Sequence, residues 1–280
     1  MESKRPSRRL QAVALALLGI GTLTIALALV GGGGAPRPQA RQAPSNTAAA
    51  LLPDLVQVTP RDVGVHPEGR RTVLGFASAV ENYGDGPLLV YGSRSAGESD
   101  MRAMQLVERS DGSRTDGPRS GRIRFTRGRH NHWHYLKFDR FELRRASGYA
   151  RVRPDQKTGF CLGDRYDTHR SFRTKPRVAE LHGQCRPDER GALAVGQGIS
   201  VGYGDDYPAY LEGQSIDITG LPPGKYVLVH RVNSDQRLRE TDYSNNASSV
   251  LLELQWPEDG TGRARLKRLK KCFGQEVCGA

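Results

Sequence analysis

The sequence is poor in cysteine, has no internal repeat and, beyond its first 30 residues, has no long segment with the period of an amphipathic helix. Four cysteines in 280 residues are too few for a disulfide-dense scaffold. Hydrophobic residues (37%) and charged residues (26%) occur at the levels of ordinary globular proteins, which excludes a wholly disordered chain. The length suits one large domain or two small ones.

The net charge of +12 is concentrated at the two ends of the chain. Residues 1–50 carry +5 and residues 259–280 carry +4, which leaves only +3 for residues 51–258. Because a nucleic-acid-binding domain carries its positive charge on the folded body, we expect no nucleic acid partner. Residues 259–280 are predicted to be a basic tail, either a solvated end or a contact for an anionic envelope surface.

The beginning of the chain has the pattern of an export signal. Four basic residues between positions 4 and 9 precede an almost uninterrupted apolar stretch at 10–30. This stretch is about long enough to span a bilayer as a helix, and small residues at its end offer a cleavage pattern. We therefore predict a signal peptide or signal anchor at 1–30 and a flexible linker at 31–50. The remainder would be secreted or anchored to the outer face of the cell membrane.

An extracytoplasmic location allows the four cysteines to pair. Four cysteines have three connectivities. We favour Cys161–Cys185 together with Cys272–Cys278, because each of these bonds closes a local loop.

Residues 51–258 are predicted to form an all-β domain, an antiparallel sandwich-like fold with long irregular loops. Short apolar or alternating runs that end in Gly, Pro, Asn or Asp recur at 72–79, 88–91, 215–219, 226–232 and 248–255. A Pro-Pro-Gly turn at 222–224 suits a reversal between two of these strands. Residues 197–212, rich in Gly and Tyr, are expected to be an irregular functional loop.

Three alternating histidines are the most informative feature of the sequence. His130, His132 and His134 would share one face of an extended strand, because side chains two residues apart point the same way. Three imidazoles on one face suit Cu(II) or Zn(II), whereas three separate buried histidines would each need a partner of their own. A passive histidine cluster that loads whatever nickel or zinc it meets is the alternative.

The same strand is expected to run from the histidines into the hydrophobic core. Leu136 and Phe138 continue the histidine face. The phase of the apolar residues then shifts at Phe141 and Leu143, which indicates a bulge or bend near Asp139.

Five ordered blocks over about residues 52–254 resemble the lysyl oxidase family of copper-dependent amine oxidases. HNHWH at 130–134 resembles the family's copper-binding motif, and KTGFCLGD at 157–164 resembles the block that holds its cofactor lysine. QGISVGYGDDY at 197–207 is similar to the block that ends in the cofactor tyrosine. SIDITGLPPGKYVL at 215–228 and ETDYSNN at 240–246 are similar to the closing segments.

The resemblance implies a β-rich catalytic domain that oxidises primary amines or peptidyl lysine. The copper ligands would be His130, His132 and His134. The quinone cofactor, lysine tyrosylquinone, would form from Lys157 and Tyr207. Amine and O2 would be converted into aldehyde, ammonia and H2O2.

Asp205 is our candidate for the general base of such a reaction, because it precedes Tyr207 by two residues and burial would raise its pKa toward neutrality. An aspartate that merely stabilises a turn is the alternative, and Asp206 competes for the catalytic role. Together with Glu212, these carboxylates would attract a cationic amine.

Two further hypotheses belong to other functional classes. A non-enzymatic envelope protein that binds copper or zinc on an oxidase-like scaffold would hold metal without forming a quinone. A zinc hydrolase would use three histidines and an open water position, but it gives Lys157 and Tyr207 no role.

Overall fold

The computed structural model describes residues 48–128, 130–154, 159–183, 185–257 and 264–279. They belong to one compact unit, residues 46–280. No helix occurs among the described residues, and hence none that could cross a membrane. The predicted N-terminal hydrophobic helix and the linker up to residue 47 lie outside them. The prediction of an all-β antiparallel domain is confirmed.

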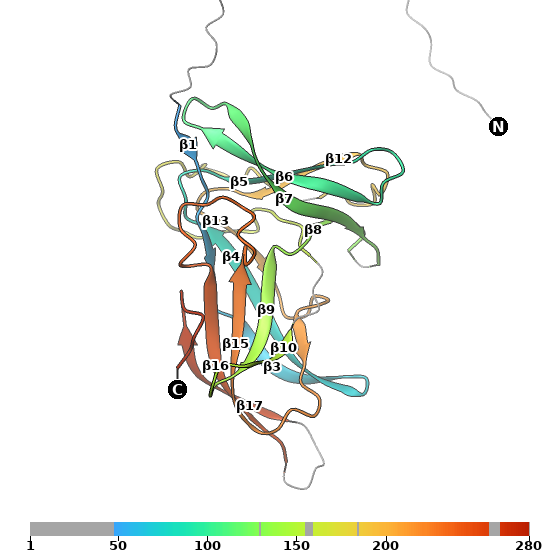
Figure 1. Cartoon of the computed structure of the whole chain (residues 1–280), viewed down its shortest axis with the longest axis vertical. Coiled ribbons are helices and arrows are strands. Elements are labelled where there is room, and N and C mark those ends of the chain that lie inside the picture. Colours follow the sequence, from blue (N-terminus) through green and yellow to red (C-terminus); the bar gives the residue numbers. More distant parts are fainter. Residues whose placement is uncertain (1–47, 129, 155–158, 184, 258–263, 280) are drawn as a thin grey trace, which may run out of the picture. The chain divides into compact units, whose positions relative to one another are not determined.

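One sheet, which we call the β8 sheet, carries two of the histidines on its edge strand. Its strand order is β12–β5–β6–β7–β8, and the short β1 pairs with β6. Every neighbouring pair is antiparallel. The strands are β1 (Ala50–Leu51), β5 (Leu88–Ser93), β6 (Asp100–Arg109), β7 (Arg114–Thr126), β8 (His132–Tyr135) and β12 (Ala194–Ile199). Figure 1 shows this sheet in the upper half of the unit.

A second sheet, the β15 sheet, has the order β10–β9–β15–β16–β17. Its central strands are apolar on both faces, because the core covers one face and the C-terminal segment covers the other. The strands are β9 (Asp139–Arg145), β10 (Arg151–Pro154), β15 (Gly224–Val232), β16 (Ala247–Gln255) and β17 (Arg265–Cys272).

The third sheet is built around β4 (Arg71–Asn82), whose apolar residues are almost all buried. Its start pairs with β3 and β14, and its end pairs with β2 and β13. Next to β13 lies β11. The partner strands are β2 (Leu55–Gln57), β3 (Arg61–Glu68), β11 (Tyr166–Asp167), β13 (Tyr203–Tyr207) and β14 (Ser215–Asp217).

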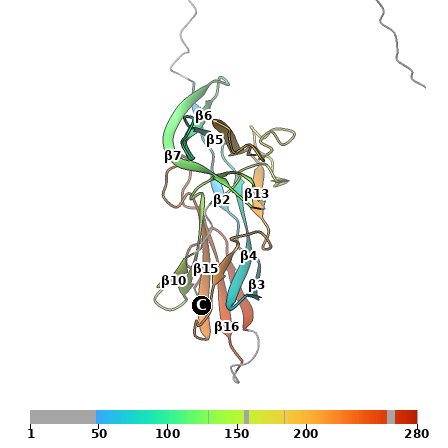
Figure 2. The ribbon, with the colours of Figure 1, turned by 90° about the vertical axis from the view of Figure 1, so that its right-hand side faces the viewer.

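The β4 and β15 sheets pack face to face. Phe76 on β4 lies 4.8 Å from Phe141 on β9 and 4.7 Å from His230 on β15, measured between ring centroids. Figures 1 and 2 show these two layers in the lower half of the unit. A single hydrophobic cluster continues from here into the β8 sheet, where it includes Leu88 and Trp133. This shared core fixes β8 relative to β13 and thereby positions the site described below.

Two segments differ from the sequence-based expectation. Residues 197–212 are not one irregular loop, because the end of β12 and all of β13 occupy half of the segment and a turn at 200–202 joins the two strands. The Pro-Pro-Gly turn does reverse the chain, but the strands on either side of it join different sheets: β14 pairs with β4, and β15 pairs with β9 and β16.

The C-terminal residues also differ from the expected tail. Arg265–Cys272 form β17, which pairs with β16 at the edge of the β15 sheet. This basic segment contains too few hydrophobic residues to indicate a strand from its sequence. It is ordered by backbone pairing with the apolar strand β16. Both predicted disulfides, Cys161–Cys185 and Cys272–Cys278, are confirmed.

Candidate metal and redox site

The three histidines converge on one point, although they do not lie on one strand. His132 and His134 are part of β8, while His130 precedes it. Asn131 has a φ of +43°, a left-handed value, so the chain bends between the first and second histidines. One ring nitrogen of each histidine lies within 4.8 Å of those of the other two. The Nε2 atoms of His132 and His134 are 2.8 Å apart.

The surroundings of His132 favour the neutral imidazole, the form that binds metal. His134 is buried, and the other two rings are partly buried. The pKa of His132 is lowered to about 4, chiefly by burial and also by charge repulsion from His130 and Arg165. Three imidazole nitrogens in this arrangement fit Cu(II) or Zn(II) by ligand type.

The chain leaves the site through a turn. β8 ends at Tyr135, Lys137 has a φ of +60°, and Asp139 begins β9 in another sheet. The predicted change of direction near Asp139 is therefore confirmed, but it is a turn between sheets. Phe138 is buried beyond this turn, so the histidine strand does not itself continue into the core.

The segment that follows the predicted cofactor lysine packs against β8. Lys157 itself lies outside the described residues. Phe160 and Tyr135 exchange two backbone hydrogen bonds of 2.7 and 3.1 Å. A Cβ added at Gly159 would lie 2.7 Å from the carbonyl oxygen of Tyr135, so only glycine fits there. The chain two residues after Lys157 is therefore held beside His134, whose Cβ lies 3.2 Å from the same added atom.

Tyr207, which is partly buried, and Asp205, which is buried, form a hydrogen-bonded pair on β13. Residues two apart on a strand share a face, which brings the two side chains together. The Tyr207 hydroxyl lies 2.7 Å from Oδ2 of Asp205 and 2.9 Å from the carbonyl oxygen of Cys161, so either oxygen can accept its hydrogen bond. The Tyr207 ring also contacts Phe160, with 4.5 Å between ring centroids.

Asp205 has the properties of a proton acceptor. It is completely buried, and burial raises its pKa to about 7. The hydrogen bond from Tyr207 and the charge of Arg165, whose Nε lies 3.4 Å from Oδ1, oppose that rise. Burial and the neighbouring carboxylate also raise the pKa of Tyr207 well above its usual value. Asp206, the competing candidate, is the next residue on the strand and is only partly buried.

One cavity of about 770 Å³ brings the histidines and the tyrosine together. Besides Tyr207 and the three histidines, it is lined by Glu68, Cys161, Arg165, Asp206, Tyr210, Leu211 and Glu212. Three carboxylates against one arginine make its walls acidic. Glu212 also approaches His130, with 3.8 Å between Oε2 and Nε2. Such walls attract a cationic amine and disfavour an anion.

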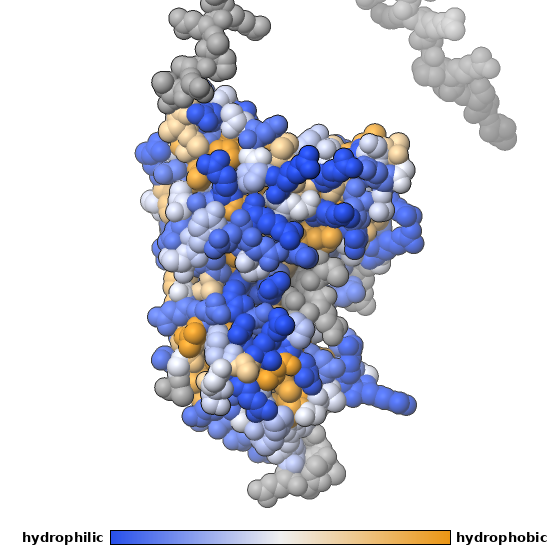
Figure 3. Space-filling model, in the orientation of Figure 1, coloured by the Kyte–Doolittle hydropathy of each residue, from blue (hydrophilic) through white to orange (hydrophobic). Residues whose placement is uncertain are grey.

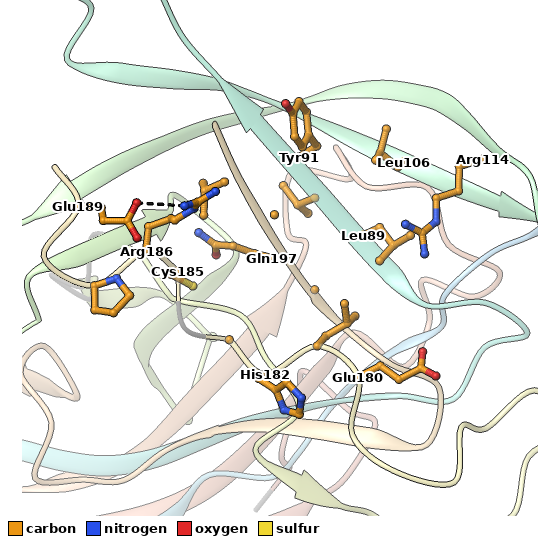
Figure 4. Close-up of a pocket in the computed structure, with 17 residues that line it drawn as sticks. Leu89, Tyr91, Leu106, Arg114, Glu180, His182, Cys185, Arg186, Glu189 and Gln197 are labelled. Atoms are coloured by element: carbon orange, nitrogen blue, oxygen red, sulfur yellow. Dashed lines mark hydrogen bonds and ion pairs between the residues drawn. The ribbon is translucent and has the colours of Figure 1, made fainter. Parts of the chain in front are cut away.

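The Cys161–Cys185 disulfide links the two halves of the site through its backbone. The carbonyl oxygen of Cys185 accepts a hydrogen bond of 3.0 Å from the backbone N–H of Trp133 on β8. The carbonyl oxygen of Cys161 lies within hydrogen-bond distance of the Tyr207 hydroxyl. A second cavity of about 580 Å³ lies against Cys185, between β12 and the 180–189 segment (Figure 4). The disulfide thus borders both cavities.

Sequence reasoning missed two residues that organise the site, Gln197 and Arg165. Gln197, on β12, accepts a hydrogen bond of 3.1 Å from the Leu162 N–H and donates one of 2.9 Å to the carbonyl oxygen of Trp133. It thereby joins the histidine strand to the segment after Lys157. Both residues stand within or next to the blocks quoted above, but nothing in their sequence context indicates these partners.

Replacing Gln197 by leucine is expected to lower the unfolding free energy by about 1–3 kcal/mol, because a buried N–H and a buried C=O lose their partners. Copper affinity should fall roughly 10-fold, as expected when the support of a metal-ligand strand is removed. Denaturant unfolding and copper titration measure the two effects.

Gln105→Leu is the matched control for this variant. Gln105 is equally buried and makes two hydrogen bonds to the backbone of Arg239, away from the histidines. It should lose stability and keep its copper affinity. Equal copper affinities for the two variants would contradict the role assigned to Gln197.

The part of the chain that contains the three histidines and Tyr207 is similar in sequence to known proteins. The family model described as lysyl oxidase matches residues 118–258. Protein-lysine 6-oxidase of Sus scrofa and that of Rattus norvegicus are each 36% identical over 121 residues, which are 42% of this chain and 41% and 25% of those proteins. Lysyl oxidase homolog 2 of Homo sapiens is 30% identical over 118 residues, 42% of this chain and 13% of that protein. The chain thus matches less than half the length of these curated relatives.

Proposed function

Because the chain belongs to the lysyl oxidase family and its histidines share a cavity with Tyr207, we propose that the protein is a copper-dependent amine oxidase. Its substrates would be primary amines or peptidyl lysine. The overall reaction takes amine, O2 and water to aldehyde, ammonia and H2O2. The observation that carries the proposal is the common cavity of the three histidines, Tyr207 and the acidic walls.

His130, His132 and His134 would hold the copper ion, and Tyr207 with Lys157 would provide the lysine tyrosylquinone. When bound, these groups supply the two-electron oxidation of the amine and pass the electrons to O2. The donor set fits, because three imidazoles converge beside the cavity that Tyr207 lines. On the tyrosine side, Tyr207 is fixed by Asp205 and by the ring of Phe160.

The chain's own side chains would bind the amine and move its proton. Glu68, Asp206 and Glu212 attract the cationic substrate into the cavity. The buried carboxylate of Asp205 would then accept the proton from the α-carbon, and a pKa near 7 matches that task at neutral pH. Arg165 keeps the carboxylate oriented through its 3.4 Å ion pair.

The protein would act outside the cytoplasm, either released or held by residues 1–30 at the outer face of the membrane. Two disulfides that include all four cysteines support this location, since such bonds persist in oxidising compartments.

Mass spectrometry of a proteolytic digest tests the proposal. Protein that has been exposed to copper and O2 should yield one cross-linked peptide containing Lys157 and Tyr207, and phenylhydrazine should give an adduct that absorbs in the visible. Lys157→Arg should yield neither product and should still bind copper. Separate, unmodified peptides from the wild-type protein would refute the oxidase and leave a metal-binding envelope protein as the explanation.

A further inference from the structure

The positive charge of the C-terminal region is arranged on a single edge strand. Five of the eight residues of β17 are basic, none is acidic, and all five are exposed: Arg265, Lys267, Arg268, Lys270 and Lys271. Across the pair with β16, Glu253 faces Lys267 and offsets one of these charges. β17 has no strand on its other side within the part of the chain that the structure describes.

Lysines on an edge strand have an ordinary explanation, because they discourage pairing with a second chain. That explanation predicts polar surroundings. The segment that follows β17 is not polar, since Phe273 is 56% exposed and Val277 is 59% exposed. In Figure 3 a small hydrophobic group stands among hydrophilic side chains at the left of the lower half, over the red C-terminal segment of Figure 1.

This segment is held firmly in place. The Cys272–Cys278 disulfide closes it into a loop. Ser249 Oγ donates a hydrogen bond of 2.8 Å to the carbonyl oxygen of Gln275, and Glu276 forms an ion pair with Arg231. Both cysteines are buried against the outer face of the β15 sheet. The exposure of Phe273 and Val277 is therefore a fixed feature of the surface.

We propose that β17 and the loop after it, together the β17 surface, dock onto an anionic lipid bilayer. Basic side chains are attracted to anionic headgroups, and exposed apolar side chains beside them insert into the interface. The positive charge of this surface favours a negatively charged partner. The exposed side chains of Phe273 and Val277 favour a partner with an apolar interior. An aliphatic side chain such as Val277 contributes nothing to stacking on nucleic acid bases.

Fluorescence quenching on the full chain tests the proposal. Phe273→Trp is compared with Tyr91→Trp, an exposed position on β5 in another sheet. The apolar segment at 10–30 is common to both variants, so its contribution cancels. In brominated phosphatidylglycerol vesicles the emission that Phe273→Trp adds to that of the native Trp133 and Trp256 should fall by roughly half, as for an interfacial residue, and the emission that Tyr91→Trp adds should fall little. In brominated phosphatidylcholine vesicles neither should be quenched strongly.

Charge reversal supplies the second arm. Lys267→Glu, Lys270→Glu and Lys271→Glu together should abolish the quenching at 273, and raising the salt concentration should weaken it without any mutation. The salt arm decides the matter if the triple variant does not fold. Absence of quenching in anionic vesicles, equal quenching in phosphatidylcholine or insensitivity to salt would each overturn the proposal. A response to duplex DNA in place of lipid would overturn it as well.

Discussion

Replacing His130, His132 or His134 by alanine is expected to weaken Cu(II) binding by more than about 100-fold, because each histidine supplies one of the three nitrogens of the site. His134 should show the largest effect, since it is the most buried of the three and the least able to be replaced by a water-exposed ligand. Copper titration and the nitrogen hyperfine pattern of the Cu(II) spectrum measure the loss. The absorbance of the phenylhydrazine adduct should disappear together with the metal.

His169→Ala provides the control for this series. The side chain of His169 is 91% exposed and lies outside the cavity that the other three histidines line. It should bind copper as the wild-type protein does. Copper binding that survives the loss of His134, or that falls equally in His169→Ala, would show that the metal is held elsewhere.

Replacing Asp205 by asparagine is expected to lower kcat by about 10²–10⁴-fold while copper binding is retained, because the variant keeps a side chain of the same shape but loses the proton acceptor. The pH dependence has a definite sign. A base must be ionised, so kcat/KM of the wild-type enzyme should fall about 10-fold per pH unit below the pKa of Asp205, which burial sets at about 7. Steady-state rates of H2O2 release between pH 5 and 9 measure both effects, with the range chosen to bracket that pKa.

Asp206→Asn separates catalysis from general electrostatics. Asp206 contributes negative charge to the same cavity, but it is not hydrogen-bonded to Tyr207 in the way that Asp205 is. Its loss should raise KM and lower kcat by less than about 10-fold. If instead Asp206→Asn removes the acidic limb of the pH profile and Asp205→Asn retains it, the two roles are reversed.

Local patterns in the sequence were sufficient to predict the fold class, the disulfides and the histidine cluster. Alternation and turn residues predicted the strands at 72–79 and 248–255, which are now β4 and β16. Loop lengths favoured the pairs Cys161–Cys185 and Cys272–Cys278. The strands and the histidine cluster depend on residues that are close in the chain. The disulfides required only a choice among the three possible pairings of four cysteines.

The features that escaped prediction depend on contacts between distant segments. Gln197 meets Leu162 and Trp133 only because the fold brings β12 close to β8, the opposite edge strand of the same sheet, and no periodicity in any one segment encodes that contact. β17 is ordered by its backbone pairing with β16, and its own basic composition does not indicate a strand. The left-handed backbone conformation of Asn131 places His130 outside the strand, and the pattern of hydrophobic residues does not predict such a conformation.

The two disulfide-bonded cysteines each present a backbone carbonyl oxygen to the site: that of Cys185 accepts a hydrogen bond from the backbone N–H of Trp133 on the histidine strand, and that of Cys161 lies within hydrogen-bond distance of the Tyr207 hydroxyl. A chain with reduced thiols lacks the covalent bond between the segment that packs on the histidine strand and the segment that contacts Tyr207. If the protein is the copper enzyme proposed above, thiol oxidation would therefore precede efficient metal loading. In the reduced chain, copper would bind histidines that are not yet held beside Tyr207. The proposed quinone would then form only in molecules that already contain the Cys161–Cys185 bond.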